Sequence, residues 1–251
     1  MNVLFIDSGI GGLTVLAQTV HDIPNLNYIY FADSEFAPYG NKTPQQITNR
    51  LKSIIETFKN QINLVVLACN TATACSINKL RQIFPFHIIG TEPAIKPATN
   101  LTKNILLVCT NATSKSKRLK ALISNCQANV KIFSPIKLAS YIDNFYLTGN
   151  RLANLQINRC INKIATKAKT CGCIVLGCTH YIFLSSKLTN KINLPVLDGN
   201  FGIKEQIKRY ICDKNISDNP NQQFIVSSKN ANLAKKYQII FSQTLAKLLD
   251  V

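Results

Sequence analysis

The segments VVLACNT (residues 65–71) and IVLGCTH (residues 174–180) decide the fold of this 251-residue chain, because they repeat one pattern in its two halves. Each is an apolar run that ends in a cysteine followed by small polar residues. Such a run is typical of a buried parallel strand whose carboxyl end presents a thiol to a cleft. A second pair, NVLFIDSG (residues 2–9) and NILLVCTN (residues 104–111), precedes the first in the same order and at a similar interval. The repeat predicts two similar halves, each with one thiol facing the same substrate.

Expected strands and helices alternate along the chain, which favours parallel α/β architecture. Thr43, Pro44 and Gln46 form a capping box with proline in the first turn, so they predict the start of a helix. Its apolar positions from Ile47 to Phe58 fall on one face. The pattern predicts strands near residues 2–6, 28–32, 62–68, 87–90, 104–108, 130–133, 173–177, 194–197 and 224–227.

The carboxyl-terminal part of the chain predicts a loop, a strand and a helix. The polar residues 214–222 form the expected loop, and the helix is expected over roughly 230–249. Its apolar stripe should dock it on one of the lobes. The stripe consists of Leu233, Tyr237, Ile240, Phe241, Leu245 and Leu248.

The composition predicts a cytoplasmic protein with a substantial core. Hydrophobic residues make up 46% of the chain, yet no apolar run approaches the roughly 20 residues that a membrane span needs. The amino terminus lacks the pattern of a cleavable signal segment. Nine cysteines, an odd number scattered through expected strands and helices, favour reduced thiols over a disulfide framework. The pair in CGC (residues 171–173) has no matching second pair or placed histidine, so we expect no metal site.

The chain is strongly basic, with 29 Lys plus Arg against 12 Asp plus Glu and a net charge of +17. This balance indicates either nucleic-acid binding or the attraction of small anionic substrates. The only dense cluster, KSKRLK (residues 115–120), is interpreted as the solvated face of a helix. A nucleic-acid-binding or partner-inhibiting protein is the less favoured alternative, and it predicts salt-sensitive binding to duplex DNA.

Polar residues follow the expected strands where ligands bind in open α/β sheets. Asp7 opens a glycine-rich turn that fits neither a dinucleotide nor a Walker motif, and that we interpret as a carboxylate cradle. Asp7 itself either caps a helix or orients a neighbouring thiol. Cys69 stands at an expected helix start, an environment that lowers a thiol pKa and also binds carboxylate. Cys178 is followed by His180, which is placed to hydrogen-bond a ligand or exchange a proton with it.

Three kinds of cysteine chemistry fit parts of this pattern. A Cys–His hydrolase or transferase that forms a thioester would use Cys178 and His180 but leave Cys69 idle. A redox pair is a second alternative, although the two thiols lie in different halves and in no C-x-x-C motif. Two thiols on opposite faces of one carbon atom would remove a proton from one side and return one from the other. A cofactor-independent racemase requires that arrangement.

The chain resembles the glutamate racemases of the aspartate/glutamate racemase superfamily. The matching segments are DSGIGGL (7–13), YFAD (30–33), PYG (38–40), ACNTA (68–72), EPA (92–94) and LGCTHY (176–181). The resemblance implies two pseudosymmetric α/β lobes, each a mostly parallel sheet flanked by helices, with the active site in the cleft between them. We expect residues 1–94 with 206–251 to form the first lobe and residues 95–205 the second.

The resemblance also implies a cofactor-independent isomerase that interconverts L- and D-glutamate and supplies D-glutamate for peptidoglycan. Cys69 would serve the D-enantiomer and Cys178 the L-enantiomer, with Asp7 and His180 as auxiliary groups. The implied substrate-binding residues are Ser8, Pro38, Tyr39, Gly40, Asn70, Thr71, Thr113 and Thr179. An aspartate or broad-specificity racemase is the closest alternative, and a homodimer stays open at this point.

Four segments depart from the pattern of that superfamily. Leu-Ala-Thr is common where this chain has VCT (residues 108–110), a proline where Ile182 stands, and Asp-Ser where DG (residues 198–199) stands. A glutamate is frequent near residues 134–143, and here Ile142 or Asp143 is the nearest counterpart. Both thiols are unaffected by these differences.

Overall fold

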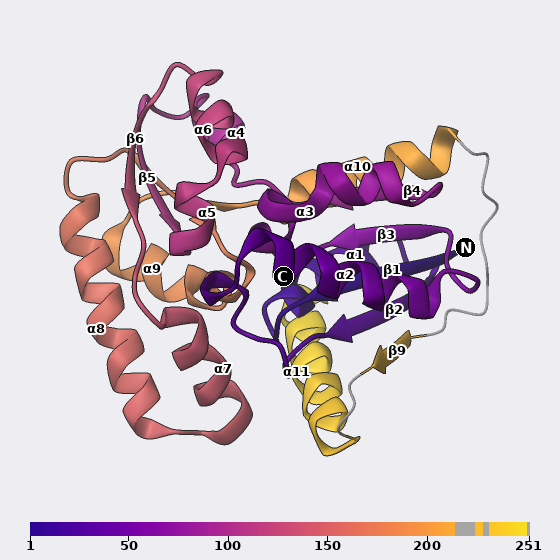
Figure 1. Cartoon of the computed structure of the whole chain (residues 1–251). Coiled ribbons are helices and arrows are strands. Elements are labelled where there is room, and N and C mark those ends of the chain that lie inside the picture. The colour runs from indigo at the N-terminus through magenta and orange to yellow at the C-terminus, as the bar shows by residue number, and fades with distance from the viewer. Residues whose placement is uncertain (214–223, 228–230, 250–251) are drawn as a thin grey trace. The chain divides into compact units, whose positions relative to one another are not determined.

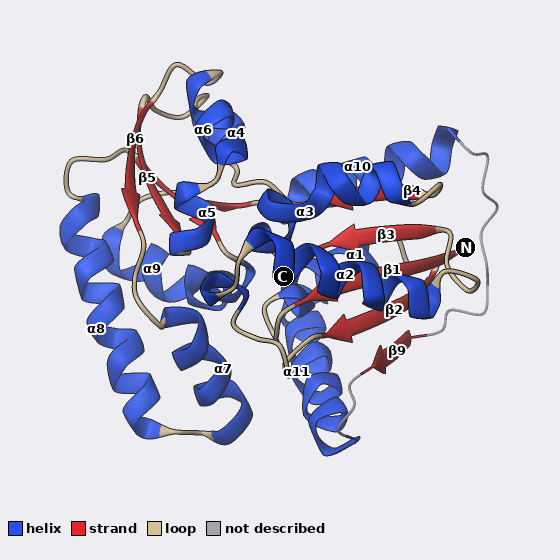
Figure 2. Ribbon diagram, viewed as in Figure 1, coloured by secondary structure: helices blue, strands red, loops and turns tan. Residues whose placement is uncertain are grey.

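The computed structural model describes residues 1–213, 224–227 and 231–249. The chain divides into two compact units, of which unit 1 comprises Met1–Thr91 with Asn200–Val251 and unit 2 comprises Glu92–Gly199. The loop predicted over residues 214–222 lies outside the described residues. Each unit is a parallel sheet with helices on its faces, as Figure 1 shows by chain position and Figure 2 by secondary structure.

The described strands of unit 1 form a five-stranded parallel sheet in the order β4-β3-β1-β2-β9. Its strands are β1 (Asn2–Asp7), β2 (Asn27–Ala32), β3 (Leu64–Leu67), β4 (His87–Gly90) and β9 (Phe224–Ser227). The sheet of unit 2 has four described strands in the order β6-β5-β7-β8, again all parallel. They are β5 (Asn104–Cys109), β6 (Asn129–Phe133), β7 (Cys173–Gly177) and β8 (Val196–Asp198).

The two sheets repeat one topology, which confirms the α/β class and the two similar lobes. If β1 is matched with β5 and the following strands in turn, the order β2-β1-β3-β4 becomes β6-β5-β7-β8. The matched segments of the sequence therefore occupy equivalent strands, β1 with β5 and β3 with β7. All nine predicted strands are present in the described part of the chain, with ends that differ by at most two residues.

In unit 1, helices cover both faces of the sheet. Helices α2 (Pro44–Phe58) and α3 (Asn70–Ile83) share a buried cluster with Leu4, Ile6 and Val65 of the sheet. On the other face the ring of Tyr30 lies 6.4 Å from that of Tyr237 in the terminal helix. This second layer consists of α1 (Gly12–Asp22), α10 (Asn200–Asp213) and α11 (Ala231–Leu249).

Two helices of unit 1 confirm predictions made from local patterns. Before α2, the backbone N–H of Gln46 donates to Thr43 Oγ1 at 3.2 Å, and the N–H of Thr43 donates to Gln46 Oε1 at 2.9 Å, which completes the capping box. Helix α11 docks against α1 and buries Tyr237, Ile240 and Phe241. The chain therefore returns to unit 1 after completing unit 2.

In unit 2, a buried cluster joins Ile95, Leu107, Leu119 and Val175 on one face of the sheet. The helices of this unit are α4 (Ile95–Ala98), α5 (Asn111–Lys115), α6 (Lys117–Ser124), α7 (Leu138–Thr148), α8 (Arg151–Ala168) and α9 (Ser185–Ile192), with a 3-10 helix η2 at Thr179–Leu184.

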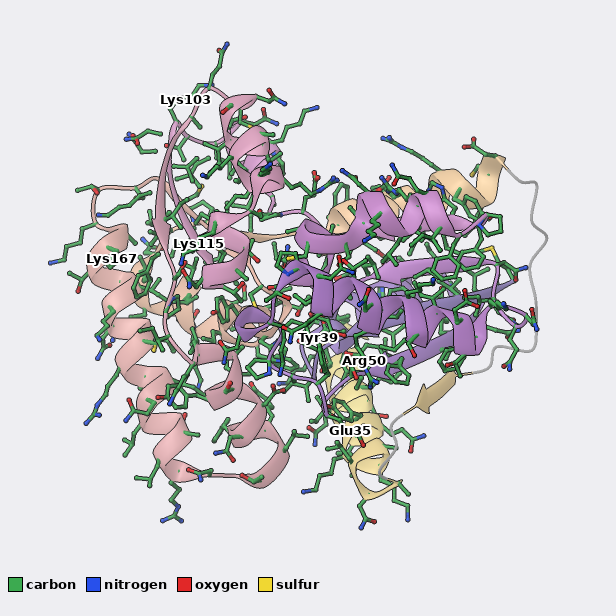
Figure 3. All side chains as sticks on the ribbon, viewed as in Figure 1. Glu35, Tyr39, Arg50, Lys103, Lys115 and Lys167 are labelled. Carbon is green, nitrogen blue, oxygen red and sulfur yellow. The ribbon has the colours of Figure 1, made fainter. Side chains whose placement is uncertain are left out.

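The basic cluster at residues 115–120 spans α5 and α6, and its structure confirms a solvated helix face. Lys115, labelled in Figure 3, is exposed, as are Lys117 and Lys120. Arg118 is half-buried and forms an ion pair with Glu92 at 2.5 Å. The cluster therefore lies on the surface while the helix packs inward through Leu119.

No helix in the described ranges is long and apolar enough to cross a membrane. All nine cysteines fall within those ranges, and each is a free thiol. Among the same residues, no group of three or more histidines, cysteines and carboxylates is arranged to hold a metal ion.

Candidate active site

The carboxyl ends of three neighbouring strands gather polar residues in unit 1. Asp7 is the register partner of Ala32, and Ile6 is the partner of Leu67, so β1, β2 and β3 end at one edge of the sheet. Asp7 closes β1, Asp33 follows β2 and Cys69 follows β3. This edge is where ligands bind in open parallel sheets.

Asp7 is fully buried and holds the turn before α1. Its Oδ1 accepts a hydrogen bond from the backbone N–H of Gly9 at 3.0 Å. The cap of α1 is Gly11, which makes no side-chain capping bond. Gly12 is required by close packing, because a Cβ there would lie 2.6 Å from the Cβ of Asp7 and 2.8 Å from the hydroxyl of Tyr30. Asp7 therefore stands fixed at the edge of the sheet.

Cys69 occupies the N-cap of α3, which confirms the predicted helix start. Its backbone is extended, and its carbonyl accepts from the N–H of Thr73 at 3.0 Å. Asn70 and Thr71 form the first turn and are buried. The first N–H groups of a helix lack partners within it and carry partial positive charge, so they favour an anion at this end.

Tyr39 lies among the acidic groups of this edge. Its phenol donates to Asp33 Oδ2 at 2.8 Å, and its side chain is almost fully buried. Burial, followed by the negative charges of Asp33, Cys69 and Asp7, raises the pKa of Tyr39 well above its ordinary value. The phenol is therefore neutral and near both Cys69 and Asp7. Its neighbours in the predicted set are Pro38, which is exposed, and Gly40, which is half-buried.

In unit 2, polar residues gather at the ends of β5 and β7. Cys109 is the register partner of Gly177, so these strands end together. Cys178 follows β7 and caps η2, whose first residues Thr179 and His180 are buried. Thr113 in α5 is also buried, and its N–H donates to Thr110 Oγ1 at 3.2 Å.

His180 joins the thiol of Cys178 to a carboxylate that the sequence analysis left without a role. The Nε2 atom lies 3.1 Å from each carboxylate oxygen of Asp143 in α7. Burial of the imidazole lowers its pKa, but the charge and hydrogen bond of Asp143 and the hydrogen bond with Cys178 outweigh that effect. The pKa of His180 is therefore raised well above its ordinary value, so the imidazolium persists beside Cys178.

The Asp143–His180 pair predicts a specific pH dependence of stability. A histidine with a raised pKa in the folded state stabilises the fold below its unfolded pKa of about 6.5 and loses that contribution as pH rises through the folded value. Asp143→Asn should therefore cost most at about pH 6.5 and just below it, and progressively less at higher pH. Urea unfolding of both proteins across this range measures the difference. His21→Gln removes the exposed His21–Asp22 pair as a control, and a constant Asp143→Asn cost would contradict the prediction.

Cys109 is a second buried thiol beside Cys178, at a position where the superfamily pattern commonly has alanine. Its Sγ lies 4.0 Å from Ser134 Oγ. Burial raises the pKa of Cys109 to about 12, and the charge of Cys178 also raises it. The hydrogen bond with Ser134 lowers this pKa but does not offset the effect of burial. Cys109 is therefore protonated at neutral pH and does not act as a competing base.

The predicted residues divide between the two units. Unit 1 holds Asp7, Ser8, Pro38, Tyr39, Gly40, Cys69, Asn70 and Thr71, and unit 2 holds Thr113, Cys178, Thr179 and His180. The residues after β1 and β3 in unit 1 correspond to those after β5 and β7 in unit 2, whereas Pro38, Tyr39 and Gly40 follow β2. Sequence reasoning assigned no role to Asp143, to Asp33 or to Arg50 of α2, whose guanidinium donates to the Asp33 carboxylate. The partners of these residues lie in other segments of the same unit.

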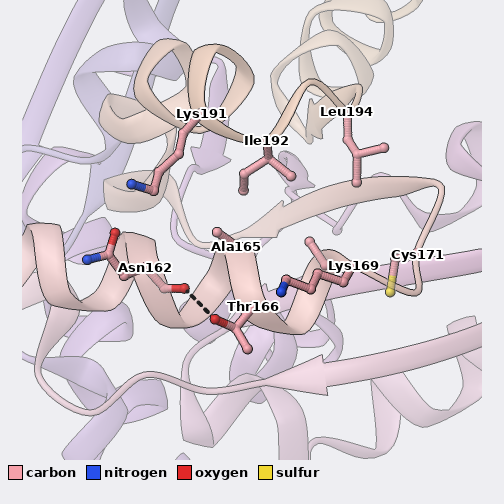
Figure 4. Close-up of a pocket in the computed structure, with 9 residues that line it drawn as sticks. Asn162, Ala165, Thr166, Lys169, Cys171, Lys191, Ile192 and Leu194 are labelled. Atoms are coloured by element: carbon pink, nitrogen blue, oxygen red, sulfur yellow. Dashed lines mark hydrogen bonds between the residues drawn. The ribbon is translucent and has the colours of Figure 1, made fainter.

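Two cavities of unit 2 are lined by other residues. One, of about 490 Å³, opens between α8 and α9 and is lined by Asn162, Lys169 and Lys191, among others (Figure 4). The other, of about 640 Å³, is lined by residues that include Ser134 and Arg159. None of the residues that line either cavity is in the predicted catalytic or substrate-binding set.

Comparisons with known proteins agree over most of the chain. Residues 9–201 match the family model described as Asp/Glu/Hydantoin racemase. A glutamate racemase of Clostridium botulinum is 34% identical over 240 residues, which cover 92% of each chain. Glutamate racemase 2 of Bacillus subtilis is also 34% identical, over 86% of this chain and 83% of its own.

Solved structures give the same result at the level of the fold. The glutamate racemase of Escherichia coli, in complex with L-glutamate and the activator UDP-MurNAc-Ala, matches with a TM-score of 0.79 at 25% identity. That match covers 97% of this chain and 94% of the other. A glutamate racemase isoform of Bacillus anthracis matches with a TM-score of 0.81 at 21% identity, over 97% and 93% of the two chains. By its family match and its similarity to these relatives, the chain belongs to the Asp/Glu/Hydantoin racemase family.

Proposed function

We propose that this protein is a cofactor-independent glutamate racemase that interconverts L- and D-glutamate with two cysteine bases. The observation that carries the proposal is the equivalent placement of two thiols. Cys69 follows β3 and Cys178 follows β7, at the same position of two repeated sheets. The glutamate racemases among its relatives support glutamate as the substrate.

In this proposal each lobe supplies one base. The first lobe, expected over residues 1–94 with 206–251, carries Cys69, and the second, over 95–205, carries Cys178. With one thiol on each face of the bound substrate, Cys178 removes the α-proton of L-glutamate while Cys69 delivers a proton to the opposite face. The reverse reaction exchanges the two roles. One cysteine must therefore be a thiolate and the other a thiol when each turnover begins.

The surrounding residues have separate proposed roles. The α-proton of an amino acid is very weakly acidic, so the developing carbanion needs hydrogen-bond donors and the exclusion of water. The helix start after Cys69 and the turn after Asp7 place backbone N–H groups suited to a carboxylate. Asp7 and His180 act as auxiliary groups beside the thiols. The proposed substrate-binding residues are Ser8, Pro38, Tyr39, Gly40, Asn70, Thr71, Thr113 and Thr179.

D-glutamate made in this way would supply cytoplasmic peptidoglycan synthesis. The net charge of +17 is compatible with a dianionic substrate, because a positive field raises the local concentration of small anions. Both proposed bases belong to the same chain, so the proposed chemistry needs no second copy of it.

A chiral assay in deuterated water tests the function and its two bases together. Purified protein without added cofactor should convert L-glutamate to D-glutamate, and the reverse, until the mixture is racemic. Early D-glutamate should carry solvent deuterium at the α-carbon, while recovered L-glutamate stays largely unlabelled, because different thiols remove and deliver the proton.

Aspartate and pyridoxal phosphate serve as controls in that assay. Faster turnover of aspartate would make the protein an aspartate racemase, and activity that depends on added pyridoxal phosphate would exclude the cofactor-independent mechanism. Product that retains its original α-hydrogen would indicate one base that serves both faces. Failure to convert glutamate at all would refute the proposal.

A further inference from the structure

Asp33 connects three segments of the unit 1 site through its backbone. It follows β2 and is 1% exposed. Its N–H donates to the carbonyl of Asp7 at 2.8 Å, which ties it to the turn that begins at Asp7. Its own carbonyl accepts from the N–H groups of Phe36 at 3.2 Å and Ala37 at 3.1 Å. The chain is thereby turned directly into the segment that contains Tyr39.

The carboxylate of Asp33 connects the same segment to α2. One oxygen, Oδ2, accepts from the phenol of Tyr39 at 2.8 Å. Arg50 of α2 donates from Nε to both oxygens at 3.0 Å and from Nη2 to Oδ1 at 2.5 Å. A buried carboxylate is tolerated where a cation and hydrogen bonds compensate its charge, and this one has both.

Phe36 packs the segment onto this ion pair. Its ring lies edge-on to that of Tyr39 at 6.1 Å, and the Arg50 guanidinium lies 5.8 Å from its centre. Tyr39 and Arg50 are labelled in Figure 3. Asp33, Tyr39 and Arg50 therefore form one anchored group, called here the Asp33 anchor.

The Asp33 anchor restricts what Tyr39 does in the site. A phenol has one hydrogen to donate, and Tyr39 directs it at Asp33. While that bond persists, the Tyr39 hydroxyl does not donate to a substrate carboxylate. Its side chain serves to hold the segment over residues 36–42, which includes Pro38 and Gly40, at the edge of the sheet.

We propose that Asp33 is a positioning residue for substrate binding, acting through Tyr39 and with Arg50 as its counter-ion. The proposal rests on the proposed racemase function and deepens it, because it assigns a residue that touches no reacting atom. Asp33 holds residues 36–42 in a fixed position beside Asp7 and the start of α3. Loss of its charge releases that segment while leaving both thiols in place.

Asp33→Asn tests the proposal with a readout that a general loss of stability does not reproduce. We expect KM for both enantiomers of glutamate to rise roughly 10-fold or more, as misplaced binding groups cause, with a smaller change in kcat. Hydrogen exchange over residues 36–42 should accelerate, and exchange over α3 should stay unchanged. Glu56→Gln is the matched control, because it removes the exposed Glu56–Lys59 pair on the same helix as Arg50.

Tyr39→Phe keeps the test decisive if Asp33→Asn does not fold, because it removes only the hydroxyl that donates a hydrogen bond to Asp33. Its KM should rise in the same direction, and the double variant should be less than additive, since coupled residues share one effect. Unchanged KM and unchanged exchange in the folded Asp33→Asn protein would overturn the proposal, as would strictly additive effects. If the unmodified protein does not racemise glutamate, the proposed function is refuted instead. Hydrogen exchange over residues 36–42 would still decide whether Asp33 anchors that segment.

Discussion

Cys69→Ala and Cys178→Ala are each expected to reduce racemisation to the detection limit while glutamate still binds. A site with one thiol can exchange a proton on one face of the α-carbon but cannot complete the transfer across it. Alanine removes the sulfur at the N-cap of α3 or at the end of β7, and neither cysteine makes a side-chain capping bond that folding would lose. Binding measured by calorimetry should therefore change much less than turnover.

Cys109→Ala is the matched control for this pair of substitutions. It removes another buried thiol, at the end of the strand adjacent to β7. Because the raised pKa of Cys109 keeps it protonated, we expect turnover close to that of the unmodified protein. Near-normal turnover in Cys69→Ala or Cys178→Ala would remove that cysteine from the mechanism.

Asp7→Asn and His180→Asn should each lower turnover by about 10- to 10⁴-fold, the range for positioned acid–base groups. His180 is hydrogen-bonded to Cys178 and to Asp143, so its replacement removes a cation from beside that thiol. Asp7 contributes negative charge near Tyr39 and Cys69 and is held by Gly9. One variant should therefore lose more kcat in the L-to-D direction, and the other should lose more in the D-to-L direction.

Thermodynamics determines where this asymmetry is visible. L- and D-glutamate have equal free energies, so kcat/KM must fall by the same factor in both directions for any variant. The difference between the faces appears only in the separate values of kcat and KM, which progress curves from each pure enantiomer provide. Small changes in kcat that are equal in the L-to-D and D-to-L directions would indicate that Asp7 and His180 have only structural roles.

Much of the fold was predictable because its signals are local. The apolar runs that end at Cys69 and Cys178 correspond to β3 and β7, and the Thr43 capping box is a four-residue pattern. The repeat of two segments predicted two similar halves, and the matching strand orders of the two sheets agree with that prediction. The two thiols at the strand ends could also be predicted, because each cysteine directly follows its apolar run in the sequence.

The interactions that support the thiols could not be predicted in this way. Asp143 meets His180 only because α7 packs against η2, and Arg50 meets Asp33 only because α2 packs on the face of the sheet that carries Ile29 of β2. Side-chain pairs of this kind depend on the packing of whole helices, which hydrophobic periodicity does not specify to within a hydrogen bond. The departure from the superfamily pattern at residues 134–143 marked the neighbourhood of Asp143 but did not supply its partner.

The interruption of unit 1 by unit 2 determines the order in which a ribosome supplies their parts. Unit 2 is one continuous stretch, so all of its residues have been synthesised by Gly199. Unit 1 then still lacks α10, the edge strand β9 and α11, and α1 lacks the helices that pack against it. Apolar surface that α11 later buries with Tyr237 and Phe241 stays uncovered during that interval. The nascent chain therefore has the complete lobe of Cys178 before the lobe of Cys69, although Cys69 is synthesised first.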